Sequence, residues 1–300
     1  MRKIEIYDYI KNIMECEVLM NNKDLIPPFL LDFIIPSKFV VIEYCELLDN
    51  SEQYGKTRYY HLNKLKECND NGYKLITIFE DEWICNKELL KSKISHILGV
   101  DNKRRIYARK CGITEISSGI ASKFCNENHI QGYTGASKKL GLYNNGRISA
   151  VMTFSKPSLS KGNRKSSKNI WELSRYCTNC NVIGGAGKMF KFFQRNYLWR
   201  EIFSFADKRW SDGNLYMKLG FEKLNDTEPN YYYFYINQDY KNYKRYHRFN
   251  FRKQELKKKL KQFDPKSTEY ENMVNNGWDR IWDCGNYKFI LKNEDYTGKL

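Results

Sequence analysis

The chain has 300 residues, of which 41% are hydrophobic and 29% charged, and its formal net charge is +16 at pH 7. One hydrophobic core seldom grows beyond about 250 residues, so we expect two domains or two domains with an extension. No apolar run approaches the ~18 residues of a membrane-spanning helix, and the first residues lack the apolar core of a signal peptide. Composition therefore predicts a soluble cytoplasmic protein with no membrane partner.

The positive charge is confined to the second part of the chain. Residues 1–100 hold 13 Lys and Arg against 16 Asp and Glu, whereas residues 101–230 hold 23 against 10 and residues 231–300 hold 15 against 9. Such a field attracts polyanions, of which nucleic acid is the commonest inside cells. The distribution favours double-stranded DNA as a partner, and the alternative is that the charge only keeps the protein soluble.

The nine cysteines show no regular framework, and an odd number indicates reduced thiols rather than disulfides. Cys177 and Cys180 form a lone Cys-x-x-Cys pair. A zinc site needs a second pair of Cys or His ligands at suitable spacing. We therefore expect these two cysteines to pack, with metal binding or redox chemistry as the less favoured alternative.

Residues 1–100 alternate between helical and extended patterns. Helix-like segments cover residues 4–13, 61–69 and 88–98, and apolar runs typical of strands cover residues 33–35, 39–42 and 73–79. This order predicts a small α/β domain.

Residues 106–238 also alternate between strands and helices, with an Asn-Gly hairpin turn at Asn145-Gly146 and a polar loop over residues 156–168. An apolar strand ending at Ile183 runs into a glycine turn and then an amphipathic helix. Free backbone N–H groups at such a turn can bind a phosphate, and a tight turn without a ligand is the alternative. The expected binding residues are Gly184, Gly185, Ala186, Gly187 and Lys188.

Residues 239–300 are expected to form a basic helical extension with terminal strands. The segment 240–262 holds ten Lys and Arg, a single acidic residue, Glu255, and interleaved aromatic residues, which suits phosphate contacts with some stacking. We predict one long helix here, a second helical segment over residues 269–275 and a strand pair over 280–291. The candidate DNA-binding residues are Lys244, Arg245, Arg248, Arg252 and Lys253.

Residues 107–236 resemble the GNAT acyltransferase superfamily and its Mom-type DNA-modification branch. The likeness is carried by Glu172-Leu173-Ser174-Arg175, by the glycine turn, and by Asp207 with Leu215-Tyr216 and Gly220-Phe221. It implies a mixed sheet in which the glycine turn binds the pyrophosphate of acetyl-CoA or a similar acyl-CoA. It also implies a polar site drawn from His129, Ser174, Arg175, Asp207 and Tyr216. Each of these has a plainer role as a helix cap, an ion-pair partner or a packing residue.

The amino-terminal domain resembles a Vsr-like PD-(D/E)XK nuclease. The likeness is carried by the segments 28–36, 41–44, 60–64 and 73–83. It implies that Asp32 and Glu43, on successive strands, bind Mg²⁺ and that Lys64, or else Lys66, supplies a positive group; hydrolysis of a phosphodiester needs both. Two departures are visible: Leu31 stands where the family has an acidic residue, and Cys45–Asn50 lacks the glycine turn and the Trp-His pair expected there.

The order of these segments, with the ending Arg280–Asn286, resembles the Hef-like homing endonucleases of T-even-type phages. The resemblance implies an α/β (α+β) protein that cuts DNA with Mg²⁺ in the cytoplasm of an infected host cell. One alternative is an acyl-CoA-dependent transferase acting on nucleic acid or protein. Another is a DNA-binding or inhibitor protein without enzymatic activity.

Overall fold

The computed structural model describes residues 2–157, 169–237 and 243–297. The chain divides into two compact units, which we call the first unit (1–100, 207–210 and 227–286) and the second unit (101–206, 211–226 and 287–300). The segment expected to form a separate extension is instead divided, because residues 239–286 belong to the first unit and the last strand belongs almost wholly to the second.

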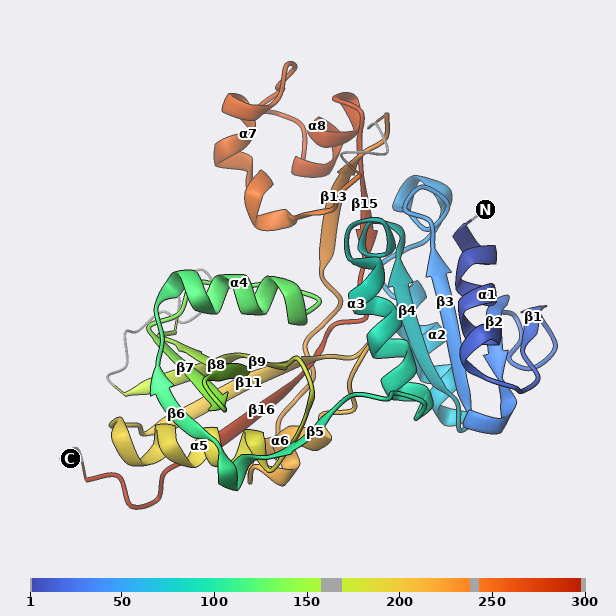
Figure 1. The fold of residues 1–300 in the computed structure, drawn as a ribbon. Helices are drawn as coiled ribbons and strands as arrows, with labels where there is room; N and C mark the ends of the chain where they lie inside the picture. The colour runs from blue at the N-terminus through green and yellow to red at the C-terminus, as the bar shows by residue number, and fades with distance from the viewer. Residues whose placement is uncertain (1, 158–168, 238–242, 298–300) are drawn as a thin grey trace. The chain divides into compact units, whose positions relative to one another are not determined.

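The first unit contains a four-stranded sheet in the order β1-β2-β3-β4, in which β3 and β4 run parallel and the other pairs antiparallel. Helix α2 buries Leu62 and Leu65 against Ile34, Val41 and Leu75 on one face of the sheet. Helices α1 and α3 lie on the other face (Figure 1). The elements are α1 (Arg2–Ile13), β1 (Leu19–Asn22), β2 (Leu31–Ile35), β3 (Val40–Cys45), α2 (Tyr60–Asp70), β4 (Lys74–Phe79) and α3 (Glu80–Leu98).

The strands and the second helix predicted in this region are confirmed, but α3 begins eight residues earlier than predicted. Its first turn carries Glu80, Asp81 and Glu82, and the Glu82 carboxylate accepts a hydrogen bond from the Phe79 N–H at 3.2 Å. This carboxylate caps the helix in place of a Ser, Thr or Asn before it, so the usual start signal is missing from the sequence.

A second, three-stranded sheet in the order β14-β13-β15 completes the first unit. One face packs Tyr233 against Phe251, Leu256 and Met273, and Phe234 and Ile281 join a cluster with Phe79 of β4. The elements are β13 (Tyr231–Tyr235), β14 (Tyr246–His247), the 3₁₀ turn η6 (Arg248–Phe251), α7 (Lys253–Lys259), α8 (Glu269–Asn275) and β15 (Trp278–Trp282).

The long basic helix predicted over residues 240–262 is wrong. Residues 240–242 lie outside the described part of the chain, and only Lys253–Lys259 is α-helical in the remainder. The half-buried Tyr246 and the buried Phe251 and Leu256 pack in the same hydrophobic cluster. They are spaced five residues apart, and residues at this spacing do not lie on one face of an α-helix. Burial of these side chains therefore overrides the helical propensity of the lysines.

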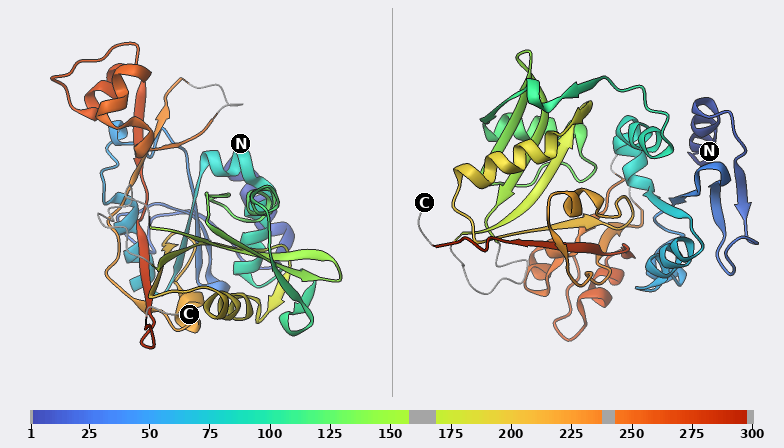
Figure 2. Two further views of the ribbon diagram at one scale, coloured as in Figure 1. Left: turned by 90° about the vertical axis from the view of Figure 1, so that its left-hand side faces the viewer. Right: turned by 90° about the horizontal axis from the view of Figure 1, so that it is seen from below.

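The second unit is a seven-stranded mixed sheet in the order β12-β16-β11-β9-β8-β7-β6. Helix α4 covers one face and α5 the other, as Figure 1 and Figure 2 show. The predicted Asn-Gly turn joins β7 and β8 with positive φ at both residues. The elements are β6 (Gly112–Glu115), α4 (Ser118–Asn128), β7 (Lys138–Asn144), β8 (Arg147–Ser155), β9 (Ile170–Thr178), α5 (Gly185–Asn196), β11 (Glu201–Asp207), α6 (Asn214–Lys218), β12 (Glu222–Lys223) and β16 (Asn286–Lys292).

A short parallel pair, β5 (Arg105–Tyr107) with β10 (Asn181–Ile183), lies just before α5. The polar loop predicted over 156–168 falls, from residue 158 onward, outside the described residues. Within the part of the chain that the structure describes, no helix combines the length and the apolar character needed to cross a bilayer. The predicted class, an α+β protein with mixed sheets, is confirmed.

Candidate functional site

The sheet of the second unit opens between its parallel strands β9 and β11. The two strands have nine and seven residues, yet they pair only at Ile170↔Glu201, Trp171↔Ile202 and Glu172↔Phe203. Beyond Glu172 the two strands no longer pair. Ligands of α/β proteins commonly bind outside the carboxyl ends of strands that part in this way.

Polar side chains from three elements gather where the two strands part. Glu172 is buried at the last paired position. The Ser204 hydroxyl donates to the Leu173 carbonyl oxygen at 2.7 Å. Tyr216 of α6 points its hydroxyl at the Phe205 carbonyl oxygen, 3.4 Å away, and stacks its ring on Phe289. A predominantly apolar core therefore holds a small polar group at its centre.

Strand β9 carries a β-bulge at this point. Leu173 pairs with Phe154 and Arg175 with Thr153, so Ser174 is the extra residue in the described ladder between β8 and β9. Its hydroxyl lies 2.7 Å from that of Ser155. A bulge interrupts the hydrogen bonding of the strands and redirects nearby side chains, and bulges are frequent next to active sites.

The electrostatics of this group keep the tyrosine protonated. Burial raises the pKa of Tyr216, and the Ser204 hydroxyl and the Arg175 guanidinium oppose this only in part. Burial lowers the pKa of Arg175 from its very high ordinary value, while its Nε donates to the Gly132 carbonyl oxygen at 2.8 Å. A neutral tyrosine hydroxyl held near a guanidinium can donate a proton or a hydrogen bond.

The glycine turn lies between β10 and α5. Gly184 has φ of 74°, and the first helical hydrogen bond runs from the Lys188 N–H to the Gly184 carbonyl oxygen at 3.0 Å. The N–H groups of Gly185, Ala186 and Gly187 precede that bond and have no partner inside the helix. They form the positive end of the helix dipole.

The glycines of this turn have different roles. A Cβ at Gly185 would lie 2.6 Å from Cγ1 of Val182 and 3.0 Å from the Tyr176 hydroxyl, so Gly185 is required for packing. A Cβ at Gly187 would meet no atom within 4 Å. Of the two, only Gly187 leaves open space beside the backbone that a phosphate could approach.

A cavity of about 580 Å³ lies along α5 from this turn. The Lys188 ammonium donates to the carbonyl oxygens of Ala108 and Cys111, so it holds the turn between β5 and β6 as well as lining the cavity. None of the described residues that line the cavity is acidic, which favours an anion. The lining residues are Ile113, Gly184, Gly187, Lys188, Lys191, Phe192, Arg195 and Asn196.

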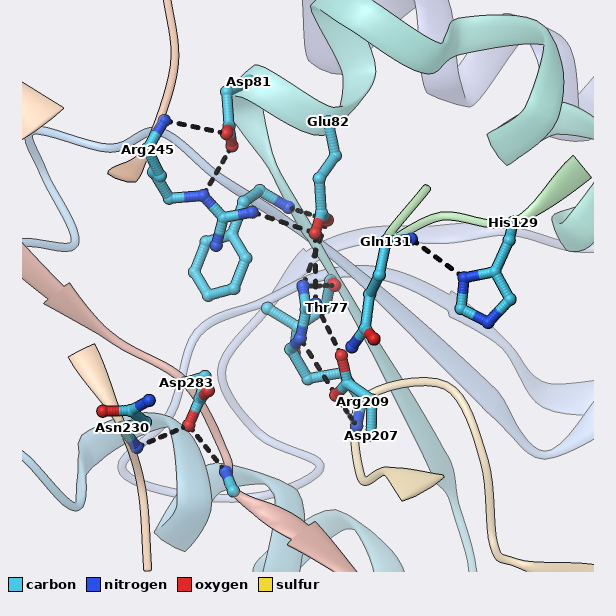
Figure 3. A network of polar contacts seen from close by, with 12 residues as sticks. Thr77, Asp81, Glu82, His129, Gln131, Asp207, Arg209, Asn230, Arg245 and Asp283 are labelled. Atoms are coloured by element: carbon cyan, nitrogen blue, oxygen red, sulfur yellow. Dashed lines mark hydrogen bonds and ion pairs between the residues drawn. The ribbon is translucent and has the colours of Figure 1, made fainter. Parts of the chain in front are cut away.

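Two of the residues that the sequence assigned to this site make other contacts. His129 ends α4, and its Nδ1 accepts a hydrogen bond from the Gln131 N–H at 3.2 Å (Figure 3). Asp207 belongs to the first unit, where its carboxylate binds Arg209 at 2.7 Å (Figure 3). The structure therefore brings together Ser174, Arg175 and Tyr216 and assigns other contacts to His129 and Asp207.

Sequence reasoning missed Glu172 and Ser204 as members of the site. Glu172 opens the motif that carries the family likeness, and Ser204 is the only hydroxyl in the run Phe203–Ala206. A lone polar side chain inside a buried strand needs a hydrogen-bond partner, and this was the available signal. The expected packing role of Cys177 agrees with the structure, because its Sγ lies 3.8 Å from that of Cys125 inside a buried cluster.

In the first unit, the structure brings Asp32, Glu43 and Lys64 together. The Glu43 carboxylate accepts from the Asp32 N–H at 3.0 Å and from the Lys64 ammonium at 2.6 Å. The Asp32 carboxylate accepts from the Tyr44 N–H at 2.8 Å and from the Lys3 ammonium at 2.6 Å. Burial raises the pKa of Glu43 to about 7; the nearby Lys64 ammonium opposes that shift and the Asp32 carboxylate adds to it.

This donor set does not fit Mg²⁺ as it stands. Every oxygen of the two carboxylates already accepts an N–H group, and Mg²⁺ demands octahedral oxygen coordination. No cluster of three His, Cys, Asp or Glu suited to a metal occurs among the described residues. Leu31 and Cys45, at the two departures from the nuclease pattern, are buried core residues. Lys66, the alternative to Lys64, is exposed to solvent.

The predicted DNA-binding residues differ in accessibility. Lys244, Arg248, Arg252 and Lys253 are exposed, and the Arg252 guanidinium lies 3.9 Å from the centre of the Phe249 ring. The side chain of Arg245 is 7% exposed and binds Asp81 at 2.7 Å and Glu82 at 2.9 Å, as Figure 3 shows. The prediction that Arg245 contacts DNA is therefore wrong, because two carboxylates already occupy its guanidinium inside the protein.

Neither a family model nor a curated protein sequence matches the chain. Among solved structures, it is similar to a GNAT-family acetyltransferase from Bacillus cereus (10% identity, 61% of this chain, 97% of that chain, TM-score 0.30). It is also similar to a Bacillus subtilis acetyltransferase in complex with CoA (12% identity, 61% of this chain, 98% of that chain, TM-score 0.33). A third similar structure is a GNAT-family acetyltransferase from Elizabethkingia anophelis with acetyl-CoA bound (12% identity, 61% of this chain, 99% of that chain, TM-score 0.31). Similarity at these TM-scores carries no argument about chemistry.

Proposed function

We propose that the second unit is an acyl-CoA-dependent transferase. The observation that carries this proposal is that strands β9 and β11 stop pairing at Glu172, while β9 leads through β10 into the open glycine turn of α5. The polar group thus lies where β9 separates from β11, and the glycine turn follows the same strand through β10. This arrangement suits a ligand that carries a diphosphate at one end and a reactive group at the other.

The residues of the turn fit the diphosphate of an acyl-CoA. Three N–H groups begin α5, Gly187 leaves space beside them, and the cavity wall carries cationic but no acidic side chains among the residues described. The helix dipole adds to this attraction for an anion. When bound, the thioester supplies an electrophilic acyl carbon.

The side chains between the strands supply the proton transfers of such a reaction. The Glu172 carboxylate is placed to accept a proton from the attacking group, and the neutral Tyr216 hydroxyl to donate one to the leaving group. Backbone N–H groups that the bulge at Ser174 leaves outside the ladder can stabilise negative charge on an oxygen. Arg175 adds positive charge nearby.

The charge of the chain favours nucleic acid as the acceptor. Residues 101–230 hold 23 Lys and Arg against 10 Asp and Glu. In the first unit, the exposed Lys244, Arg248, Arg252 and Lys253 offer further phosphate contacts. Double-stranded DNA is therefore the acceptor or partner to test first, with protein as the comparison.

We predict that Gly187→Glu weakens acetyl-CoA binding at least about 30-fold, because a carboxylate then occupies the anion site. Gly119→Glu is the matched control, because it adds the same carboxylate at an exposed glycine that does not line the cavity, so binding is expected within about threefold of the native protein. Calorimetric titration with acetyl-CoA measures both. The same proteins are then compared for transfer of a radiolabelled acetyl group to duplex DNA and to protein. Equal affinity in the two variants, or no binding by the native chain, would overturn the proposal.

A second candidate function rests on the convergence of Asp32, Glu43 and Lys64 in the first unit. We propose, as this second candidate, that the first unit is a DNA endonuclease of the homing type that belongs to a phage mobile element. Two acidic side chains on adjacent strands beside a lysine are the residue types that phosphodiester hydrolysis uses. Because the carboxylates of Asp32 and Glu43 already bind Lys3 and Lys64, cleavage is measured both with and without Mg²⁺.

For this candidate we expect cleavage of long duplex DNA, seen on a gel with and without Mg²⁺. Asp32→Asn and Glu43→Gln should each abolish cleavage, whereas Lys66→Met, which changes an exposed lysine on the same helix as Lys64, should leave it unchanged. Absence of cleavage by the native protein, or cleavage that survives both carboxylate variants, would exclude it. If the protein binds DNA but neither cleaves it nor binds acetyl-CoA, the result would indicate a non-enzymatic DNA-binding or inhibitor protein.

A further inference from the structure

We propose that Cys125 and Cys177 form a site of reversible oxidation, at which a hydroperoxide converts the two thiols into a disulfide between α4 and β9. Both residues belong to the second unit, and their Sγ atoms lie 3.8 Å apart. A disulfide bond is about 2.0 Å long, so the two sulfurs need to approach by about 1.8 Å. Disulfides of intracellular proteins are usually transient and redox-sensing, which fits thiols that pack in the reduced state.

The fold gives Cys177 a different partner from the one that its sequence neighbourhood offers. Cys180 completes a Cys-x-x-Cys pair with Cys177, but it packs against the cluster that contains Met189 of α5. Cys177 packs in the cluster of Cys125 on α4. These two helices cover opposite faces of the sheet, as Figure 1 shows. The thiol in contact with Cys177 therefore comes from a residue 52 positions earlier in the chain.

Contact between the two thiols activates Cys125. The Cys177 thiol donates a hydrogen bond to the Cys125 sulfur. This bond lowers the pKa of Cys125; burial opposes the shift, and the Arg175 guanidinium adds to it. A thiolate, not a thiol, attacks a peroxide. Cys125 is therefore the sulfur that is oxidised first, and Cys177 is the thiol that completes the disulfide.

A small oxidant reaches the buried pair where α4 ends. Cys125 lies in the last turn of this helix, which ends at Asn128, and the adjacent Asn126 and Glu127 are exposed. Helix ends open locally at a low cost in free energy. Hydrogen peroxide is little larger than water, so the opening of one turn admits it while bulkier oxidants stay outside.

The reaction balances without any group beyond the peroxide. The Cys125 thiolate attacks one peroxide oxygen, so that an S–O bond forms, the O–O bond breaks and the leaving hydroxide takes the proton of the Cys177 thiol as water. The Cys177 thiolate then attacks the sulfenic sulfur of Cys125. The S–S bond forms, and the second hydroxide leaves and takes up the proton that Cys125 released. Two thiols lose two electrons, and the peroxide is reduced to two molecules of water.

The disulfide would act on the candidate site through Arg175. Arg175 and Cys177 are two positions apart on β9 and share a face of the sheet. The Arg175 Nε also donates to the carbonyl oxygen of Gly132, in the loop after α4, at 2.8 Å. A movement of α4 toward β9 therefore displaces this guanidinium relative to Tyr216. This consequence rests on the proposed transferase function, whereas the disulfide itself does not.

The test treats the folded protein with hydrogen peroxide, blocks the remaining thiols with iodoacetamide and maps the peptides by mass spectrometry. We expect a cross-linked peptide pair that contains Cys125 and Cys177, lacks two hydrogen atoms and separates on treatment with dithiothreitol. Cys125→Ala and Cys177→Ala should each lose this pair. The matched control is Cys180→Ala, which removes the other thiol of the Cys-x-x-Cys pair and should keep it.

The same samples are assayed for acetyl transfer. Oxidation should lower the transfer rate of the native protein at least about tenfold, because a displacement of about 1 Å at a site costs this much or more. Dithiothreitol should restore the rate, and peroxide should leave the rate of Cys125→Ala unchanged.

The outcomes separate this inference from the transferase proposal. A link between Cys177 and Cys180, or a link between Cys125 and Cys177 that forms only after unfolding in urea, would overturn the oxidation site. A protein that forms the predicted link but transfers no acetyl group before oxidation would support the oxidation site and refute the transferase. A protein that transfers acetyl groups but forms no link would do the reverse.

Discussion

Replacing Arg209 by methionine is expected to lower the free energy of unfolding by about 3–5 kcal/mol. The guanidinium, whose side chain is 6% exposed, lies between Glu82, with two bonds of 3.1 Å, and Asp207, at 2.7 Å. Methionine fills most of the space but leaves these carboxylates without their main counter-charge. Removal of one partner from a buried ion pair is costly because the other charge then stays away from water without compensation.

Arg245 cannot replace Arg209 in this network. Its guanidinium already binds Asp81 at 2.7 Å and Glu82 at 2.9 Å, as Figure 3 shows. Burial alone would lower the pKa of Arg209, but the carboxylates of Asp207 and Glu82 raise it above its ordinary value. The network therefore fixes the segment 207–210 and the residue Arg245 to the first turn of α3, all within the first unit.

Equilibrium unfolding in urea, followed by fluorescence, measures the loss. Arg147→Met is the control, because it removes the same group from an exposed position and should change stability by less than about 0.5 kcal/mol. A loss below about 1 kcal/mol in Arg209→Met would show that Glu82 and Asp207 find other partners or reach water.

The elements that sequence predicted correctly are those whose apolar residues recur with the period of the element that forms. The alternation over residues 73–79 becomes β4, and the Asn-Gly pair becomes the turn between β7 and β8. The predictions that failed concern residues whose contacts are distant in the chain. The basic segment 240–262 reads as a helix on composition, yet Tyr246 and Phe251 pack with residues from β13 and α8. Arg245 reads as a surface cation because Asp81 and Glu82 lie more than 160 residues away.

The sequence predicted the parts of the candidate site that are continuous in the chain, and it missed the parts that depend on contacts between distant residues. The glycine turn and its helix are continuous in sequence, so their form could be expected. The group at Glu172, Ser204 and Tyr216 depends on the pairing of β9 with β11 after a connection through α5, and on where that pairing ends. Asp207 was assigned to the site by the family likeness, but Arg209, two residues on, binds its carboxylate.

Gly213→Ala is expected to destabilise the second unit by more than about 3 kcal/mol, whereas Gly220→Ala should cost about 1–2 kcal/mol. Both glycines flank α6 and have similar positive φ, 81° and 88°, so both alanines suffer the same backbone strain. They differ in space. A Cβ at Gly213 would lie 2.1 Å from Cζ and 2.8 Å from Cε2 of Phe289, whereas one at Gly220 meets no atom within 4 Å.

The difference between the two variants reports on the site itself, because the Phe289 ring stacks on Tyr216 with centroids 4.8 Å apart. An alanine at 213 must push Phe289 aside, and Tyr216 then loses the support that directs its hydroxyl at the gap between β9 and β11. We therefore expect Gly213→Ala to abolish acetyl transfer even at temperatures where it remains folded, and Gly220→Ala to retain it. Urea unfolding and the labelled-acetyl assay measure the two effects. Variants that unfold at the same urea concentration would show that Phe289 moves without cost, whereas acetyl transfer by the folded Gly213→Ala protein would refute the role of Phe289 in positioning Tyr216.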